Sequence, residues 1–367
     1  MNAVRDFIQA NPSAWLSIGG LMVGIAFGTL VMRTNFCTMG AISDAVTFND
    51  YRRFRAWVLA AATALIGAQM LDAYGIVALS KSVYLNPRLN WFGNIAGGAM
   101  FGFGMVFAGG CASRNLARAG AGDLRSLMTL MVMALFAYMT NGGILGPLRD
   151  WIEQATSIPL GRWSLPTQSI GELAGTLAQL GPDRGNALTA AAVAAAMALY
   201  SFKDQGFRKS WNHILSGFGI GLCVVAGWAL TGLAFDDLAE RPTTPLSLTF
   251  VRPTADALEW LKRFTAGMVP GFGVASVFGT VLGSFTAATA MGRFKLTTFT
   301  GVADTQRALF GAAFMGIGGV LALGCTIGQA VTGLSTLAAG SFLTFAAIIT
   351  GAIGGLKKLE RMLGDEG

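Results

Sequence analysis

Apolar segments long enough to cross a bilayer recur along the whole chain, separated by short charged stretches. A helix needs about 20 predominantly apolar residues to cross the hydrocarbon core. Hydrophobic residues make up 53% of the 367 residues and charged residues only 12%, whereas soluble domains carry about 25% charged residues. Because the backbone must satisfy its own polar groups in lipid, the sequence predicts an all-α polytopic membrane protein.

Nine segments are predicted to be transmembrane helices, and together they account for most of the apolar residues. They are residues 13–32, 56–79, 91–108, 124–140, 187–202, 214–233, 266–283, 308–323 and 336–355. The segment 166–180 is semi-polar and is predicted to be a short packed or interfacial segment. The 50 glycines favour close helix packing, since small residues let helix backbones approach each other in lipid.

Three basic clusters predict the orientation of the chain. Lys and Arg near the ends of membrane helices favour the cytoplasmic side, which explains the net charge of +7 without a nucleic-acid partner. The predicted location is the inner membrane of a bacterial cell, with the N-terminus outside and the C-terminus cytoplasmic. The clusters are Arg52, Arg53 and Arg55; Lys203, Arg208 and Lys209; and Lys357, Lys358 and Arg361.

Two alignments of the chain with itself indicate an internal repeat. An offset of 214 residues places Cys111 on Cys325 and also superimposes four glycines of each half. An offset of 251 places the run 27–29 on the run 278–280, and it makes Ala288 the counterpart of Cys37. The predicted repeats are residues 1–180 and 181–367. The glycine pairs at the first offset are Gly97 and Gly311, Gly102 and Gly316, Gly104 and Gly318, and Gly110 and Gly324.

Charge distinguishes the two repeats. The first cysteine motif continues through Arg114, Arg118 and Arg125, whereas the aligned positions of the second motif are uncharged. The two motifs are therefore expected to face opposite sides of the membrane. Inverted-topology repeats of this kind place substrate sites near the bilayer midplane, at interrupted helices. Short re-entrant helices at these two motifs complete the predicted fold.

The segments 109–115 and 324–336 contain polar residues and interrupt longer apolar runs. Backbone that leaves a helix in the membrane must be buried in protein or line a water-filled cavity. A third break surrounds Cys37. Thiols are weak hydrogen-bonding groups with a polarisable sulfur, which suits a soft sulfur atom. Cys223 lies in an apolar run without a break and is predicted to pack as a small hydrophobe. The candidate pathway residues are Cys37, Cys111, Cys325, Arg114, Thr326 and Gln329, with Gly110 and Gly324 allowing close approach of the backbone.

The run 324–329, followed by 332–335, resembles the most specific signature of the YeeE/YedE family of membrane sulfur transporters. The Gly110 and Cys111 pair and the overall length agree with it, so the resemblance covers nearly the whole chain. It implies inverted repeats with short inserted helices, and thiosulfate passage by contact with Cys111 and Cys325. Thiosulfate importers of that family also carry a cysteine before the final motif, and residues 271–295 contain none. The cargo is therefore expected to be thiosulfate or a related sulfane-sulfur compound.

The functional prediction is a transporter, not an enzyme, with no cofactor and no metal, since a lone His213 cannot form a metal site. Its expected partners are a small sulfur-containing anion, the lipid bilayer, and a cytoplasmic sulfur-carrier protein of TusA type or a sulfur-responsive regulator. An alternative is a sulfur-transfer or sulfur-sensing protein that forms a cysteine persulfide at Cys111 or Cys325. A thiolate is needed for that chemistry, and Arg114 could stabilise one.

Overall fold

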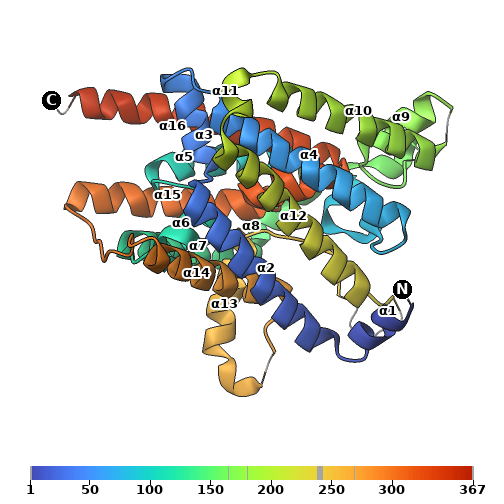
Figure 1. Cartoon of the computed structure of the whole chain (residues 1–367), viewed down its shortest axis with the longest axis horizontal. Coiled ribbons are helices and arrows are strands. Elements are labelled where there is room, and N and C mark those ends of the chain that lie inside the picture. The colour runs from blue at the N-terminus through green and yellow to red at the C-terminus, as the bar shows by residue number, and fades with distance from the viewer. Residues whose placement is uncertain (1, 164, 180, 238–242, 268, 366–367) are drawn as a thin grey trace.

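The computed structural model describes residues 2–163, 165–179, 181–237, 243–267 and 269–365 of the chain. Helices dominate it, and the labelled N-terminus and C-terminus lie at opposite ends of the molecule in Figure 1. The longer helices are α2 (Pro12–Thr34), α4 (Arg52–Ala73), α7 (Leu124–Asn141), α10 (Pro182–Phe202), α12 (Trp211–Ala234), α14 (Phe272–Ala290), α15 (Val302–Leu321) and α16 (Ala339–Asp365).

Short helices and one strand pair connect these long helices. They are α1 (Asn2–Gln9), α3 (Thr38–Thr47), α5 (Gly98–Phe107), α6 (Ala112–Gly120), α8 (Gly146–Thr156), α9 (Ile170–Leu177), α11 (Gln205–Arg208) and α13 (Val251–Lys262). The strands β1 (Arg88–Leu89) and β2 (Ile158–Pro159) pair antiparallel. Tighter or wider helical turns form η1 (Leu79–Lys81), η2 (Val83–Leu85), η3 (Gly93–Gly97), η4 (Leu160–Trp163), η5 (Phe264–Ala266), η6 (Gly328–Gly333) and η7 (Leu334–Thr336).

Eight helical segments of the described chain are long and apolar enough to cross a bilayer, and each overlaps one predicted span. The prediction of an all-α polytopic membrane protein is thus confirmed. The ninth predicted span, 308–323, falls on the 20-residue α15, which packs against α5 and α7. Its first turns carry Asp304 and Arg307, which lower its apolar character. Segment 166–180 contains α9, which at eight residues is too short to cross and packs on α10; residue 180 itself lies outside the described residues.

Helices α2 and α14 pack closely along their length, and they run parallel. Gly20 lies against the backbone of Phe272, and two turns further along Gly28 lies against the backbone of Thr280. A Cβ atom at Gly28 would lie 2.1 Å from the carbonyl oxygen of Thr280, so glycine permits this approach. Helices related by inverted topology must run in opposite directions. The alignment at offset 251, which equates α2 with α14, is therefore wrong.

The antiparallel partner of α2 is α12. Gly19 near the start of α2 faces Leu230 near the end of α12, and Leu30 near the end of α2 faces Gly219. Helix α12 in turn packs beside α4, as α2 packs beside α14. In an inverted repeat, α2 therefore corresponds to α12 and α4 to α14, in the same order along the chain.

The offset of 214 does describe the packing of α5 against α15. Gly97 lies against Gly318, and Gly104 lies against Gly311. Adding 214 to Gly97 and Gly104 gives Gly311 and Gly318, so each contact is the image of the other, as a two-fold relationship requires. The halves that this relationship joins are α2–α7 and α12–α16. A boundary between residues 180 and 181 falls in the connecting segment and stays a prediction.

The long helices define two faces of the molecule. On the first, α4 and α12 begin near Arg52, and α7 begins beside the segment that precedes α15, where Asp123 and Thr297 form a bridge. We call this the Arg52 face. On the second, α7 and α12 end, α14 begins, and α8 carries Arg149. We call this the Arg149 face.

Candidate functional site

Two helix breaks with the same backbone shape lie at the repeat-related motifs. Helix α5 ends at Phe107 and α6 begins at Ala112, while α15 ends at Leu321 and helical backbone resumes at Thr326. Gly109 and Leu323, which are 214 residues apart, both adopt left-handed backbone, with φ of 69° and 57°. That conformation is unusual for leucine, so the second break keeps the geometry of the first despite its different residue.

Two side-chain amides satisfy carbonyl groups that the breaks release. Asn115 Nδ2 donates to the carbonyl of Gly110 at 2.8 Å. Its repeat counterpart Gln329 donates to the carbonyl of Ala322, and its Oε1 accepts from Ser341 Oγ at 2.6 Å. The structure thus shows Gln329, predicted to line the pathway, stabilising the second break with both ends of its amide.

The two glycines that precede the motif cysteines have little free space around them. A Cβ atom at Gly110 would lie 3.2 Å from Arg114 Cγ, and one at Gly324 would lie 3.3 Å from Gln329 Cγ. Each glycine therefore packs against a side chain of its own motif. Gly324 also lines a cavity on the Arg149 face.

Cys37 and Cys111 meet in the interior. Cys111 is 1% exposed and occupies the N-cap position of α6, and its Sγ lies 3.4 Å from Ser113 Oγ. The Cys111 thiol also interacts with the thiol of Cys37, and it lies near the hydroxyl of Thr326. Cys37 caps α3, and its Sγ accepts a hydrogen bond from the N–H of Gly40 at 3.4 Å. Residues from both repeats therefore surround Cys111.

Cys325 is fully buried and lies next to a hydroxyl that the sequence interpretation missed. Its Sγ accepts from the N–H of Gly328 at 3.4 Å and lies 3.9 Å from Thr249 Oγ1. Thr249 precedes α13 as Cys37 precedes α3. Thr249 lies 212 residues after Cys37, close to the repeat offset, and it contacts Cys325 as Cys37 contacts Cys111, so the two side chains take equivalent places beside their motif cysteines. The predicted counterpart, Ala288, lies instead inside α14.

Several buried polar atoms around the thiols have no hydrogen-bond partner within the described residues. They belong to Thr38, which follows Cys37, and to Arg114, Asn115 and Thr326. Thr326 is fully buried and Thr38 is 3% exposed. A buried polar atom without a partner costs about 1–3 kcal/mol, and more if it is charged. The Nη1 atom of Arg114 is therefore a prominent unsatisfied donor at this site.

Arg118, by contrast, is engaged by the protein. Its Nη1 donates to the carbonyl of Gly109 at 3.1 Å, and its guanidinium forms an ion pair with Asp123 at 2.7 Å. The two arginines of the first motif thus have different roles: Arg118 holds the break, and Arg114 keeps a free donor beside the cysteines.

Cys223 lies apart from these breaks, within the unbroken helix α12, where it is 7% exposed and belongs to the hydrophobic core. In the part of the chain that the structure describes, no three His, Cys, Asp or Glu side chains gather as a metal site.

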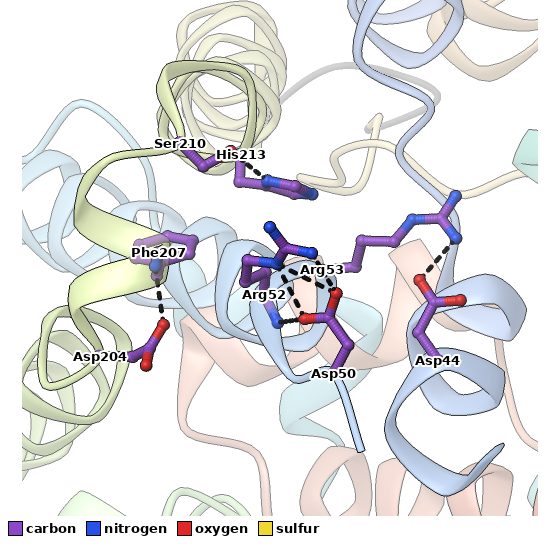
Figure 2. Close-up of polar contacts among 8 residues, drawn as sticks. All are labelled: Asp44, Asp50, Arg52, Arg53, Asp204, Phe207, Ser210 and His213. Carbon is purple, nitrogen blue, oxygen red and sulfur yellow. Dashed lines mark hydrogen bonds and ion pairs between the residues drawn. The ribbon is translucent and has the colours of Figure 1, made fainter. Parts of the chain in front are cut away.

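Ionic contacts on the Arg52 face hold the segment that carries Cys37 (Figure 2). Arg53 of α4 forms an ion pair with Asp44 of α3 at 2.9 Å and donates to the carbonyl of Asn35 at 2.9 Å. Asn35 ends α2 in left-handed backbone. Arg53 therefore joins the C-terminal end of α2 to the body of α3, and it holds the two helices on either side of Cys37 together.

Residues 33–354, which include both breaks, match the family described as Sulphur transport. The thiosulfate transporter TsuA of Spirochaeta thermophila is 29% identical over 339 residues, which cover 90% of this chain and 96% of that protein. The thiosulfate transporter TsuA of Escherichia coli is 28% identical over 324 residues, covering 85% and 86%. The probable transporter YedE of Escherichia coli is 28% identical over 106 residues, covering 28% and 24%. The chain therefore belongs to the YeeE/YedE family of sulphur transport proteins.

Proposed function

We propose that this protein imports thiosulfate, or a related sulfane-sulfur compound, across the inner membrane. The proposed pathway runs from Thr249 and Cys325 through Cys111 to Cys37. Two similar proteins that align along most of their length are named thiosulfate transporters, which supports this cargo. The pathway also accounts for the burial of three thiols at interrupted helices.

The observation that carries the proposal is the unsatisfied Arg114 Nη1 near Cys111, together with the unsatisfied Thr326 Oγ1, which lies near the same thiol. A small anion at this point would accept from both atoms and compensate the buried charge of Arg114. The oxygen atoms of thiosulfate supply such acceptors, and its terminal sulfur matches the soft thiol. The site thus fits an ion that has oxygen atoms at one end and a sulfur atom at the other.

Passage by hydrogen bonding requires weak sites in series. A thiol is a weak donor, so no single cysteine holds the anion tightly, and an ion that binds weakly at several stations can leave each one. Uptake of a panel of sulfur oxyanions, measured in a strain that cannot import them, tests the proposal. We expect thiosulfate uptake with the wild-type chain and its loss in Cys325→Ala. Wild-type uptake by Cys111→Ala and Cys325→Ala would contradict the cysteine pathway, and Cys223→Ala is the matched control.

The alternative is sulfur transfer at Cys111, which the neighbouring charge of Arg114 favours. The Cys111 thiolate would attack the terminal sulfur of thiosulfate, the S–S bond would break, and sulfite would leave with the bonding electron pair. Intact-mass measurement after incubation with thiosulfate distinguishes the two functions. A mass gain of one sulfur atom that Cys111→Ala abolishes would favour transfer, and an unchanged mass favours transport.

We place the Arg52 face in the cytoplasm, with the N-terminus outside and the C-terminus inside. The three basic clusters are its support, since positive residues favour the inner side. A membrane-impermeant thiol reagent tests this orientation with Asp237→Cys, an exposed position beyond the end of α12. Labelling in intact cells is expected, and labelling only after lysis would reverse the orientation.

A cytoplasmic partner would then meet the Arg52 face. We propose a sulfur-carrier protein of TusA type or a sulfur-responsive regulator as that partner. The support is chemical: imported sulfane sulfur needs an acceptor, and the exposed residues Lys203, Arg208 and Lys209 on this face favour an acidic surface. Co-purification with and without substitution of these three residues by Gln tests the contact, and equal recovery would exclude the basic face as its site.

A further inference from the structure

The final turns of helix α10 line a shallow apolar recess of about 700 Å³. Residues three and four positions apart on a helix share one face, and the lining follows this spacing. Leu199, in the middle of the face, is 73% exposed. Because α10 is long and apolar enough to cross a bilayer, the recess faces the acyl chains of the surrounding lipid. Its lining residues are Ala195, Ala198, Leu199, Tyr200, Phe202 and Lys203.

Helix α10 lies at the periphery of the molecule, as Figure 1 shows. It packs on α9 and α4, and its buried residues Ala190 and Ala194 share a hydrophobic cluster with Leu65 of α4. Ala195 and Leu199 are exposed, so they lie on the side of α10 that these contacts leave open. A lipid molecule can therefore reach the recess from the bilayer.

Arg55 of α4 is held against the last turn of α10. Its guanidinium donates to the carbonyl of Tyr200 and lies 4.6 Å from the centre of the Tyr200 ring. The carbonyl of Arg55 accepts from Ser201 Oγ at 3.2 Å. Among the residues that the structure describes, Arg55 forms no ion pair with a carboxylate. Its half-buried charge is therefore fixed in position and available to an anion.

Lys203 adds a second positive charge at the same end of the recess. It is exposed and directly follows the last residue of α10, within one turn of Tyr200. The carboxylate of Asp204, which comes next in the chain, accepts from the N–H of Phe207 at 2.7 Å and caps α11, as Figure 2 shows. Two cations and one engaged carboxylate thus lie where the apolar recess ends, so this end favours an anion.

We propose that the recess binds an anionic phospholipid, with an acyl chain along α10 and the phosphate held by Arg55 and Lys203. The lining is hydrocarbon apart from its charged end, which matches the two parts of a lipid. Arginine can donate two parallel hydrogen bonds to a phosphate, and basic residues at the end of a membrane helix attract anionic lipids. The site does not depend on the proposed transport function, so either can fail without the other.

A lipid bound there would hold α10 on α4, and these two helices contact the second break. Gln69 of α4 donates to the carbonyl of Ser335 at 3.0 Å and accepts from Asn186 of α10 at 3.4 Å. Ser335 Oγ in turn accepts from Trp228 Nε1 at 3.0 Å. Since the lipid contacts both helices, binding should stabilise the folded protein. We therefore expect phosphatidylglycerol to raise the thermal midpoint in detergent.

Native mass spectrometry of the purified full-length protein tests the site with phosphatidylglycerol and phosphatidylcholine that carry identical acyl chains. We expect the wild type to retain phosphatidylglycerol several-fold more often than phosphatidylcholine. The double variant Arg55→Gln and Lys203→Gln should lose this preference. The double variant Lys357→Gln and Lys358→Gln is the matched control and should keep it, because both lysines are exposed near the end of another membrane helix, α16.

Ala195→Trp tests the recess itself, since it fills the apolar surface and leaves both cations in place. It should lower the retention of phosphatidylglycerol several-fold. Equal retention of the two lipids by the wild type, or an unchanged preference in the variant of Arg55 and Lys203, would overturn the proposal. An equal rise of the thermal midpoint with inorganic phosphate would also overturn it. A dimer that Ala195→Trp separates, with unchanged lipid retention, would assign the recess to a second copy of the chain.

Discussion

Thr249 occupies, beside Cys325, the position that Cys37 occupies beside Cys111. Each residue precedes the short helix that follows the first long helix of its half, and each contacts the motif cysteine of the same half. The two-fold relationship thus relates four positions on the proposed pathway, of which three carry a thiol and one carries a hydroxyl. The hydroxyl lies on the Arg149 face, and the unmatched thiol lies toward the Arg52 face.

Replacement of Thr249 tests the importance of this difference. Thr249→Cys places a thiol at the fourth of these positions, and we expect thiosulfate uptake at least equal to that of the wild type. Thr249→Val has the same shape without a hydrogen-bonding group, and uptake should fall several-fold because Cys325 loses its polar neighbour. Initial rates of radiolabelled uptake measure both. Equal rates in all three chains would remove Thr249 from the pathway.

The substitution Cys111→Ser distinguishes passage by hydrogen bonding from sulfur transfer. A hydroxyl can donate to an anion but cannot form a persulfide, so Cys111→Ser should retain part of the uptake that Cys111→Ala loses. The comparison uses uptake rates at equal amounts of protein in the membrane. Serine and alanine variants with the same complete loss would favour the covalent alternative.

Substitutions of Arg114 and Arg118 should differ in their effects on uptake and on thermal stability. Arg114→Gln removes a buried charge that lacks a full set of partners, so we expect uptake to fall at least tenfold while the thermal midpoint in detergent stays constant or rises. Arg118→Gln loses the contact with Gly109 and the ion pair with Asp123, so its midpoint should fall. A lower midpoint for Arg114→Gln than for Arg118→Gln would reverse these roles.

The crossing of α5 and α15 should not tolerate a side chain at Gly318. A Cβ atom there would lie 2.6 Å from the carbonyl oxygen of Gly97, and overpacking of this kind costs about 1–3 kcal/mol. We expect Gly318→Ala to lower the thermal midpoint. Gly354→Ala in α16 is the control, because a Cβ atom at Gly354 meets no heavy atom within 4 Å. Equal midpoints would show that the two helices can separate.

Asp123 should make stability depend on pH. Although burial opposes its ionisation, the hydrogen bond from Arg125 and the charges of Arg118 and Arg125 hold the pKa of Asp123 below its ordinary value of 3.8. A carboxyl group with a lowered pKa in the folded state adds stability above its unfolded pKa and loses it as the pH falls through the folded pKa. We expect Asp123→Asn to lower stability by about 1–2 kcal/mol at neutral pH.

Thermal midpoints measured at neutral pH and at acid pH check this expectation. The difference between the wild type and Asp123→Asn should shrink below about pH 4, where the carboxyl of the unfolded chain takes up a proton, and it should disappear as the pH falls through the folded pKa. A difference that is the same at all pH values would assign the effect to packing and not to charge.

The features that could be predicted from the sequence are those that depend on a local pattern of residues. Apolar length marked eight of the helices, and the glycine spacing around Cys111 and Cys325 identified both breaks. The offset of 214 succeeded because close helix crossings demand glycine at fixed positions. The offset of 251 failed because glycines in α2 and α14 serve a contact between these helices, and a shared packing role produced the same short run of residues.

The remaining parts of the site depend on tertiary contacts that no local pattern encodes. Thr249 lies in a loop, and only the paths of α12 and α13 bring it to Cys325. The Gln329 side chain donates a hydrogen bond to the Ala322 carbonyl, which needs this donor because α15 ends at Leu321. The unsatisfied donor of Arg114 is evident only in the structure, where Arg118 forms the contacts with the Gly109 carbonyl and with Asp123.

The parallel pairing of α2 with α14 has a consequence for how the protein is made. Helix α2 ends at Thr34 and α14 begins at Phe272, so α2 enters the bilayer about 240 residues before its partner. At roughly 5–20 residues per second, synthesis leaves the glycine face of α2 without α14 for on the order of ten seconds or more. Cys325 emerges later still. The nascent chain therefore spends most of its synthesis as a set of inserted helices, several of which still lack the partners that their glycine faces contact in the folded protein.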